Sequence, residues 1–282
     1  MAQYPDSPVL VGTEWLASNL DEPRIRIVEV DEDSGAYEVG HIPNAIAWHW
    51  QDDLHDSLRR DFVDTASLTD LLARSGVTDD TMVILYGGNN NWFAAYAYWY
   101  LKHQGFDNVK LLNGGRKKWE IENRPVTTER PADGAVSNPP ELPGPRARIR
   151  ALRDEVLSGN GGNGAVYIDV RSPEEFRGEL LAPPHLPQEQ AQVPGHIPGA
   201  KNIPWSKAAD EDGTFKSPSE LKELYGSVGA GPDKQIIAYC RIGERSSHTW
   251  FVLHELLGYE DVKNYDGSWT EYGSLVGVPV ER

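Results

Sequence analysis

Residues 235–258 read QIIAYCRIGERSSHTWFVLHELLG and contain Cys240, which is the only cysteine in the 282-residue chain. A short apolar run ends at Tyr239, and apolar residues at helical spacing follow over 250–257, before Gly258. The stretch therefore predicts a buried strand, a tight loop that begins at Cys240, and a helix. Open α/β sheets bind ligands at the carboxyl ends of their strands, so this loop is the first candidate for a functional site.

The pattern around this stretch is written twice in the chain. The tripeptide HIP stands at 41–43 and again at 196–198, and a segment rich in proline, glycine and charge separates the two halves. Short apolar runs alternate with helical stretches in each half, which predicts parallel strands covered on both faces. The expected strands are Ile25–Val30, Met82–Tyr86, Val166–Val170 and Gln235–Tyr239.

These observations predict an α/β fold with two tandem domains, each a parallel-sheet core flanked by helices. The boundaries are 1–125 for the first domain, 126–147 for an interdomain linker and 148–282 for the second domain. A proline-rich insertion at 180–194 occurs in the second half only, where it is either a lid or a surface excursion.

Charge and composition exclude several classes of partner. The chain has 27 Lys and Arg against 43 Asp and Glu, a formal net charge of −16, which repels nucleic acid and anionic membrane surfaces. No run approaches the roughly 20 apolar residues of a membrane span, and the start of the chain lacks a signal-peptide pattern. A single cysteine forms no internal disulfide and no zinc motif. We expect a cytoplasmic protein with no metal, no cofactor, no nucleic-acid partner and no membrane partner.

The loop after Cys240 has the composition of a site for anions. Arg241 and Arg245 bring positive charge, and Gly243 lets the backbone curl so that successive N–H groups point inward. Together with the amino end of the following helix, these features predict a lowered thiol pKa and a resting thiolate, the nucleophilic form of cysteine. The natural substrate is then a small anion that contains sulfur or phosphorus.

The loop, the tandem halves, the HIPGA of 196–200 and the closing NYDGSW of 264–269 resemble the two-domain rhodaneses, the thiosulfate sulfurtransferases. The second half is especially similar to actinobacterial members. The resemblance implies two tandem rhodanese-like domains, of which the second is catalytic. It also implies that the cysteine takes the outer sulfur of thiosulfate, releases sulfite, and passes sulfur from a persulfide to cyanide or a thiol.

Carried over by position, the resemblance gives roles to individual residues. Cys240 is the nucleophile and persulfide carrier, Arg241 binds thiosulfate, and Arg245 closes the loop. The persulfide is held by N–H groups from Arg241, Ile242, Gly243, Glu244, Arg245 and Ser246. Asp169 and Arg171, after the matching strand, either line the pocket or form a salt bridge that ties their loop to the domain.

In the first half, Gly87 stands where the second half has Cys240, and the following GNNNW offers neither nucleophile nor arginine. We interpret residues 1–125 as an inactive domain and Asn89–Asn91 as turn formers. The matched histidines His41 and His196 are interpreted as structural, and His248 as a surface residue of the helix.

Three alternatives to a thiosulfate sulfurtransferase stay open. A 3-mercaptopyruvate sulfurtransferase usually has small neutral residues after its cysteine, whereas this chain has Arg241. A persulfide carrier would deliver sulfur to an acceptor protein in cofactor biosynthesis. A phosphatase or arsenate reductase would also use a cysteine-arginine loop, but with the arginine one residue further from the cysteine than Arg245. Ile242 and the negative Glu244 depart from the basic character of some family loops and weaken the expected binding of thiosulfate.

Overall fold

Both predicted parallel sheets are present in the computed structural model, which describes residues 4, 7–132, 134–159, 164–183 and 190–282. The first sheet has the order β1-β5-β4-β2-β3 and the second has the order β6-β10-β9-β7-β8, with every neighbouring pair parallel. The first sheet consists of β1 (Leu10–Val11), β2 (Ile25–Glu29), β3 (Ile46–Ala47), β4 (Met82–Tyr86) and β5 (Val109–Leu112). The second consists of β6 (Arg150–Ala151), β7 (Val166–Asp169), β8 (Lys201–Asn202), β9 (Ile236–Tyr239) and β10 (Val262–Tyr265).

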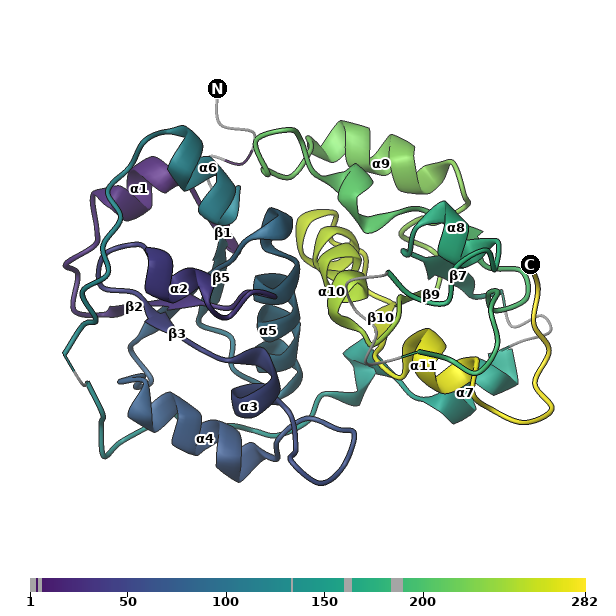
Figure 1. Cartoon of the computed structure of the whole chain (residues 1–282), viewed down its shortest axis with the longest axis horizontal. Helices are drawn as coiled ribbons and strands as arrows, with labels where there is room; N and C mark the ends of the chain where they lie inside the picture. Colours follow the sequence, from purple (N-terminus) through teal and green to yellow (C-terminus); the bar gives the residue numbers. More distant parts are fainter. Residues whose placement is uncertain (1–3, 5–6, 133, 160–163, 184–189) are drawn as a thin grey trace. The chain divides into compact units, whose positions relative to one another are not determined.

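The central strands are apolar because helices cover both faces of each sheet (Figure 1). Strand β4 reads MVILY and β9 reads IIAY, and every residue of β9 is buried. Tyr86 and Tyr239 end these two strands, and each hydroxyl accepts a hydrogen bond from the N–H of the isoleucine in an HIP tripeptide. The predicted α/β fold with two tandem domains is therefore confirmed.

Helices alternate with the strands as the sequence predicts. The first sheet is flanked by α1 (Thr13–Ala17), α2 (Ala36–Val39), α3 (Trp50–Leu54), α4 (Thr65–Arg74), α5 (Trp92–His103) and α6 (Gly115–Ile121). The second is flanked by α7 (Arg153–Gly159), α8 (Pro173–Phe176), α9 (Pro218–Gly226), α10 (Glu244–Trp250) and α11 (Ser268–Tyr272), and a π-helical segment (Phe251–Leu256) continues α10. Helices α8 and α9 each begin with a serine capping box and a proline in the first turn.

The chain divides into two units that are not contiguous in sequence. The first unit comprises residues 1–146 and 210–215, and the second comprises 147–209 and 216–282. Within the first unit, Thr127 exchanges two backbone hydrogen bonds with His41, so the beginning of the proline-rich segment lies against the HIP turn. Of the predicted insertion at 180–194, residues 184–189 lie outside the described part of the chain.

The two matched histidines make the same contacts in their own units. The ring of His41 stacks on Tyr37, with centroids 3.7 Å apart, and the ring of His196 stacks on Phe176 at 3.6 Å. Each Nδ1 is paired with the carbonyl oxygen of the residue on which the ring stacks. Both histidines therefore hold a turn in place, as the sequence indicated.

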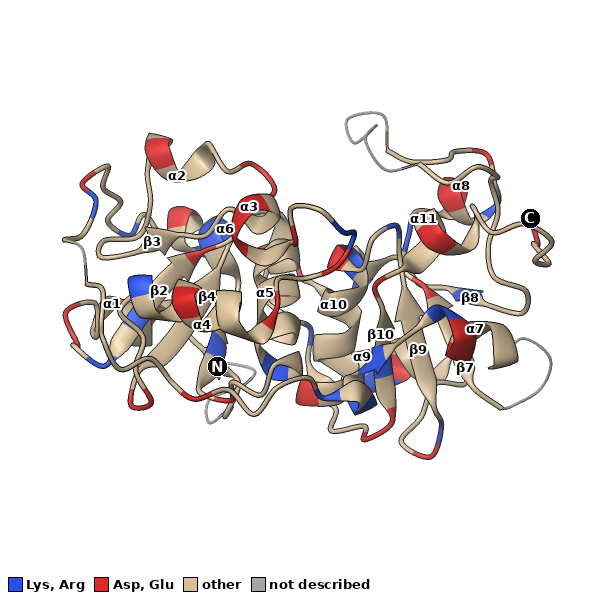
Figure 2. Cartoon of the chain, turned by 90° about the horizontal axis from the view of Figure 1, so that it is seen from below, with Lys and Arg blue, Asp and Glu red and all other residues tan. Residues whose placement is uncertain are grey.

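Charged residues are distributed over helices and loops of both units (Figure 2). Acidic residues outnumber basic ones, as the composition requires. Among the described residues, no helix combines the length and apolar character needed to span a membrane.

Candidate active site

Cys240 follows directly on β9, and the loop of 240–243 leads into α10, as the sequence predicts. Gly243 adopts a φ of +100°, and a Cβ at this position would lie 2.7 Å from the Cα of Asp266. The loop therefore needs glycine both for its left-handed conformation and for its close approach to the segment after β10. Its side chains are almost entirely inaccessible: Cys240, Glu244 and Ser246 are 0% exposed, Arg241 2%, Ile242 4% and Arg245 4%.

The sulfur of Cys240 has polar neighbours among residues 243–246. The N–H of Gly243 donates a hydrogen bond to Sγ at 3.2 Å, and the thiol donates to Oε2 of Glu244 at 3.1 Å. The same carboxylate oxygen accepts the N–H of Ile242 at 3.2 Å. Two of the predicted N–H donors, those of Gly243 and Ser246, therefore face the sulfur, whereas the N–H of Ile242 donates to the carboxylate of Glu244.

The thiol pKa moves in the direction opposite to the predicted one. Burial raises the pKa of Cys240, and the charge of Glu244 raises it further, while Arg245 and the N–H of Ser246 only partly oppose them. The prediction that the loop lowers this pKa and keeps a resting thiolate is therefore wrong for this structure. The sequence shows the arginines, but not that the carboxylate turns toward the sulfur.

Arg245 is paired with a residue that the sequence analysis missed. Its Nη1 and Nη2 donate to the two carboxylate oxygens of Glu175 at 2.8 and 3.1 Å. Burial alone would raise the pKa of Glu175, but the charge and hydrogen bonds of Arg245 lower it below the usual value. The Ser172–Glu175 spacing is a capping-box signal, yet nothing local indicates a partner 70 residues further along the chain.

Asp169 and Arg171 form a buried ion pair at the carboxyl end of β7, which is the neighbour of β9 in the sheet. Arg171 donates to both carboxylate oxygens, with a shortest distance of 2.6 Å, and also to the carbonyl of Gly195 at 2.7 Å. Its guanidinium lies 4.9 Å from the ring centroid of Trp269. Among the described residues, Nη1 of Arg171 has no hydrogen-bond partner. The salt bridge is thus present, and one buried donor remains available at this edge of the sheet.

Two further polar side chains support the loop from β10 and α11. The hydroxyl of Ser268 accepts the N–H of Cys240 at 3.1 Å and donates to the carbonyl of Tyr265. The amide of Asn264 donates to the carbonyl of Gly243 at 3.0 Å, and its oxygen accepts the hydroxyl of Ser246. Asn264 and Ser268 belong to the NYDGSW segment, so a signal existed in the sequence, but it did not specify their contacts.

His248 lies one turn into α10 and is fully buried, with its ring 5.2 Å from that of Trp205 in an edge-on arrangement. The prediction of a surface histidine is wrong. The cause is that this face of α10 packs against the segment of 205–208.

In the first unit, the loop after β4 is the counterpart of the Cys240 loop, and its N–H groups donate to side chains of the same unit. The N–H of Gly87 donates to the amide oxygen of Asn91 at 3.0 Å, and the N–H of Gly88 donates to Asp31. A Cβ at Gly87 would lie 2.2 Å from the carbonyl oxygen of Val30. Asn89, Asn90 and Asn91 all have positive φ, which agrees with their interpretation as turn formers.

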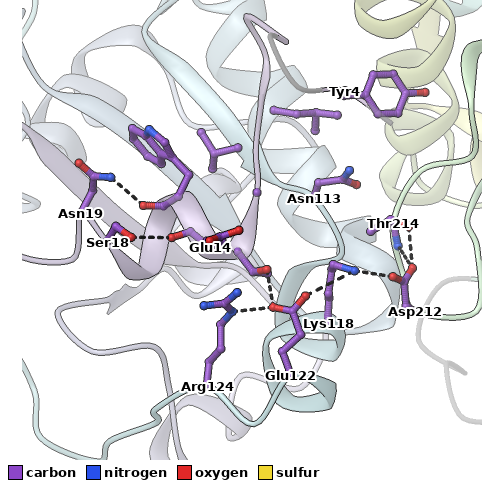
Figure 3. A pocket seen from close by; sticks show the side chains of 15 residues that line it. Tyr4, Glu14, Ser18, Asn19, Asn113, Lys118, Glu122, Arg124, Asp212 and Thr214 are labelled. Atoms are coloured by element: carbon purple, nitrogen blue, oxygen red, sulfur yellow. Dashed lines mark hydrogen bonds and ion pairs between the residues drawn. The ribbon is translucent and has the colours of Figure 1, made fainter. Parts of the chain in front are cut away.

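A cavity of about 710 Å³ in the first unit is lined by α1, α6 and the segment of 212–214 (Figure 3). Lys118 lies between Glu122 and Asp212, at 3.6 and 2.6 Å, and Arg124 pairs with Glu122 at 2.5 Å. No cysteine or histidine is among the described lining residues. Because its cations are already paired, this cavity does not compete with the Cys240 loop as the chemical site. Nor do the described residues contain a cluster of three or more side chains suited to holding a metal ion.

Comparison with known proteins agrees with the tandem arrangement. The model of the rhodanese-like domain matches residues 12–122 and 152–275. The "Putative thiosulfate sulfurtransferase" of Mycolicibacterium smegmatis is 60% identical over 278 residues, covering 98% of each chain. The "Sulfur carrier protein TtuD" of Thermus thermophilus is 53% identical over 286 residues, covering 99% of this chain and 98% of the relative.

Solved structures show the same fold. SseA of Escherichia coli, a structure described for the rhodanese fold and catalytic mechanism of 3-mercaptopyruvate sulfotransferases, matches with a TM-score of 0.77 at 27% identity, covering 92% of this chain and 98% of SseA. The anaerobic ergothioneine biosynthesis enzyme of Chlorobium limicola matches with a TM-score of 0.83 at 23% identity, covering 96% of this chain and 69% of the enzyme, which shows the fold alone. From the domain model and the close relatives together, the chain belongs to the rhodanese family of sulfurtransferases, in its two-domain form.

Proposed function

We propose that this protein is a thiosulfate sulfurtransferase that moves sulfane sulfur to cyanide or to a thiol through a persulfide on Cys240. The observation that carries the proposal is the position of Cys240, at the carboxyl end of β9, in a loop whose Gly243 N–H donates to the sulfur. The Gly87 loop of the first unit has no cysteine, so in this proposal the second unit performs the chemistry.

The reaction balances as two displacements at sulfur. The thiol first loses its proton to the solvent. The thiolate then attacks the outer sulfur of thiosulfate, whose S–S bond breaks and whose electron pair leaves with sulfite. Cyanide then attacks the outer sulfur of the persulfide, the S–S bond of the persulfide breaks, and thiocyanate leaves. The thiolate of Cys240 is regenerated, and no external oxidant or reductant is consumed.

The buried arginines supply the binding of the anionic donor in this proposal. Arg171 offers Nη1, which has no hydrogen-bond partner within the described chain, and Asp169 holds its other side in a fixed orientation. Arg241 lies beside the nucleophile in sequence and is 2% exposed. Arg245 is oriented by Glu175 and contributes its charge to the loop rather than a free pair of donors.

The test is intact-protein mass spectrometry after incubation with thiosulfate, and again after addition of cyanide. We expect a gain of one sulfur atom on Cys240 and its removal as thiocyanate. Absence of the sulfur gain, with Cys240 shown to be reduced and reactive, would contradict thiosulfate as the donor.

A persulfide carrier is a second candidate, because the relative from Thermus thermophilus that shares 53% of its residues is named a sulfur carrier protein. As a carrier, this chain would form the same Cys240 persulfide but discharge it slowly to small acceptors and rapidly to a partner protein. Comparing the discharge rates with cyanide, with a small thiol and with a sulfur-acceptor protein separates the two. A 3-mercaptopyruvate donor is tested in the same assay by measuring pyruvate release.

A further inference from the structure

Glu244 differs from the other buried carboxylates around the Cys240 loop. The acidic groups that neighbouring elements contribute are already engaged: Asp169 with Arg171, Glu175 with Arg245, Asp266 with Arg150, and Glu271 with the hydroxyl of Tyr265. Glu244 forms looser ion pairs: its Oε1 lies 3.7 Å from guanidinium nitrogens of Arg241 and Arg245, which is within ion-pair distance but beyond hydrogen-bond distance. Within the described residues, this fully buried oxygen accepts no hydrogen bond.

The other oxygen of Glu244 is directed at the nucleophile. Oε2 accepts the thiol of Cys240 at 3.1 Å, and the N–H of Ile242 fixes the same oxygen at 3.2 Å. The hydrogen bond from the backbone of the loop therefore fixes the rotamer in which the carboxylate contacts the sulfur. A thiolate and a carboxylate at this distance, in a site without exposure to water, repel each other, and the guanidiniums of Arg241 and Arg245 at 3.7 Å from the carboxylate offset this repulsion only in part.

We propose that Glu244 determines the protonation state of Cys240 and the charge of the preferred sulfur donor. Its carboxylate keeps the sulfur protonated between turnovers, which protects it from alkylation and oxidation, because the thiolate is the reactive form. The same charge opposes a dianion such as thiosulfate more than a persulfide donor with less negative charge. The donor part of this inference rests on the proposed function, whereas the thiol part does not.

A different role for the same contact makes the opposite prediction. If Glu244 served as the proton acceptor for the thiol, its amide variant would lose general-base assistance, which is worth about 10²–10⁴-fold in rate. If Glu244 only held the loop through Ile242, the amide variant would change neither the thiol nor the donor preference, because an amide oxygen still accepts that N–H.

The first experiment needs no sulfur donor. Alkylation of Cys240 by iodoacetamide, in which the thiolate displaces iodide, is followed by mass spectrometry from neutral to alkaline pH. We expect a wild-type midpoint above the ~8.5 of a free cysteine. In Glu244→Gln we expect the midpoint about 1–3 pH units lower. A wild-type midpoint at or below that of free cysteine, or an unchanged midpoint in the variant, would overturn the proposal.

The second experiment measures sulfite release with thiosulfate in a single turnover at neutral pH. We expect Glu244→Gln to release sulfite faster, by about tenfold for each pH unit of the shift, and with a lower KM. The KM for cysteine persulfide, a donor with less charge, should change less. Slower release in the variant would identify Glu244 as the proton acceptor instead.

Glu174→Gln is the matched control, because it makes the same replacement on α8 at a side chain that is 48% exposed and pairs with Arg177. It should leave the alkylation midpoint and sulfite release unchanged. If thiosulfate gives no persulfide with any variant while the alkylation midpoints behave as expected, the proposed function fails. The effect of Glu244 on the protonation state of Cys240 is then still supported. If Glu244→Gln does not fold, Glu244→Ala, which also removes the carboxylate, takes its place, because burial alone already raises the wild-type midpoint and only the difference between the two proteins reports on Glu244.

Discussion

The loops that follow β4 and β9 occupy the same place in two sheets of identical strand order. After β9, the N–H of Gly243 points at a nucleophilic sulfur. After β4, the N–H groups of Gly87 and Gly88 are consumed by Asn91 and Asp31. The first unit therefore lacks more than a cysteine, because the N–H groups of its loop already donate to side chains of the same unit.

The two units also differ in the charged residues at the carboxyl ends of β7 and β2, the strands beside β9 and β4. In the second unit, Arg171 follows Asp169 of β7 by two residues. In the first unit, Asp31 follows Glu29 of β2 by two residues. Glu29 pairs with Arg116 from α6, and burial raises the pKa values of both Glu29 and Asp31. An anionic donor would therefore meet a carboxylate in the first unit and a guanidinium in the second.

The largest effect on sulfur transfer is expected at Cys240, where the matching loop of the first unit has Gly87. Cys240→Ser should abolish thiocyanate formation, at least a 10³-fold loss, because serine cannot form the persulfide. Circular dichroism should stay unchanged, since the replacement is nearly isosteric. Thiocyanate production by this variant above the blank would remove the basis of the proposed function.

The second effect concerns the ion pair that the first unit lacks. Glu175→Gln removes the carboxylate that pairs with the buried guanidinium of Arg245, leaves only the looser contact with Glu244 at 3.7 Å, and should reduce the free energy of unfolding by about 3–5 kcal/mol. The folded pKa of Glu175 is lowered, so its contribution is present above its unfolded pKa of about 4.3 and is lost as the pH falls through the folded value.

Denaturant unfolding of wild type and Glu175→Gln at neutral and acidic pH measures this contribution. The stability difference should be full at neutral pH and shrink below pH ~4. The exposed Glu174→Gln should stay within about 0.5 kcal/mol of wild type. A difference that does not depend on pH would show that the charge of Glu175 is not what stabilises the unit.

The third test places a cysteine in the loop that we predict to be inactive. Gly87→Cys in the Cys240→Ser background should regain no sulfur transfer, because a Cβ at Gly87 lies 2.2 Å from the carbonyl oxygen of Val30. The forced backbone shift should destabilise the first unit by about 1–3 kcal/mol. Thermal unfolding and mass spectrometry after thiosulfate measure the two outcomes, and a persulfide on the new cysteine would show that the loop opens.

The smallest effect is expected at the cavity of the first unit, whose lining cations form ion pairs. Lys118→Met removes a partly exposed ion pair with Asp212, and such pairs contribute about 0–1 kcal/mol. Sulfur transfer should be unchanged, and the midpoint of thermal unfolding should fall by no more than roughly 4 °C. A large loss of transfer would connect this cavity to the chemistry of the second unit.

Local pattern in the sequence determined the fold and the position of the proposed nucleophile. Apolar runs of four or five residues, separated by helical stretches, specify buried parallel strands, and glycine marks turns that need a positive φ. The repeat of HIP and of the strand-loop-helix unit specified two domains, and Cys240 stood at a strand end. These signals are readable because each depends on residues that are close together in the chain.

Tertiary structure alone decided the electrostatics of the loop. Arg245 pairs with Glu175, which lies 70 residues away, and this contact offsets part of the positive charge that the sequence assigned to the sulfur. The carboxylate of Glu244 is only four residues from Cys240, yet its direction depends on how α10 begins and on the complete burial of the site. A sequence shows which charged residues lie near a cysteine along the chain. The pKa of a buried thiol depends instead on which groups contact it in the folded protein and on the loss of water around it.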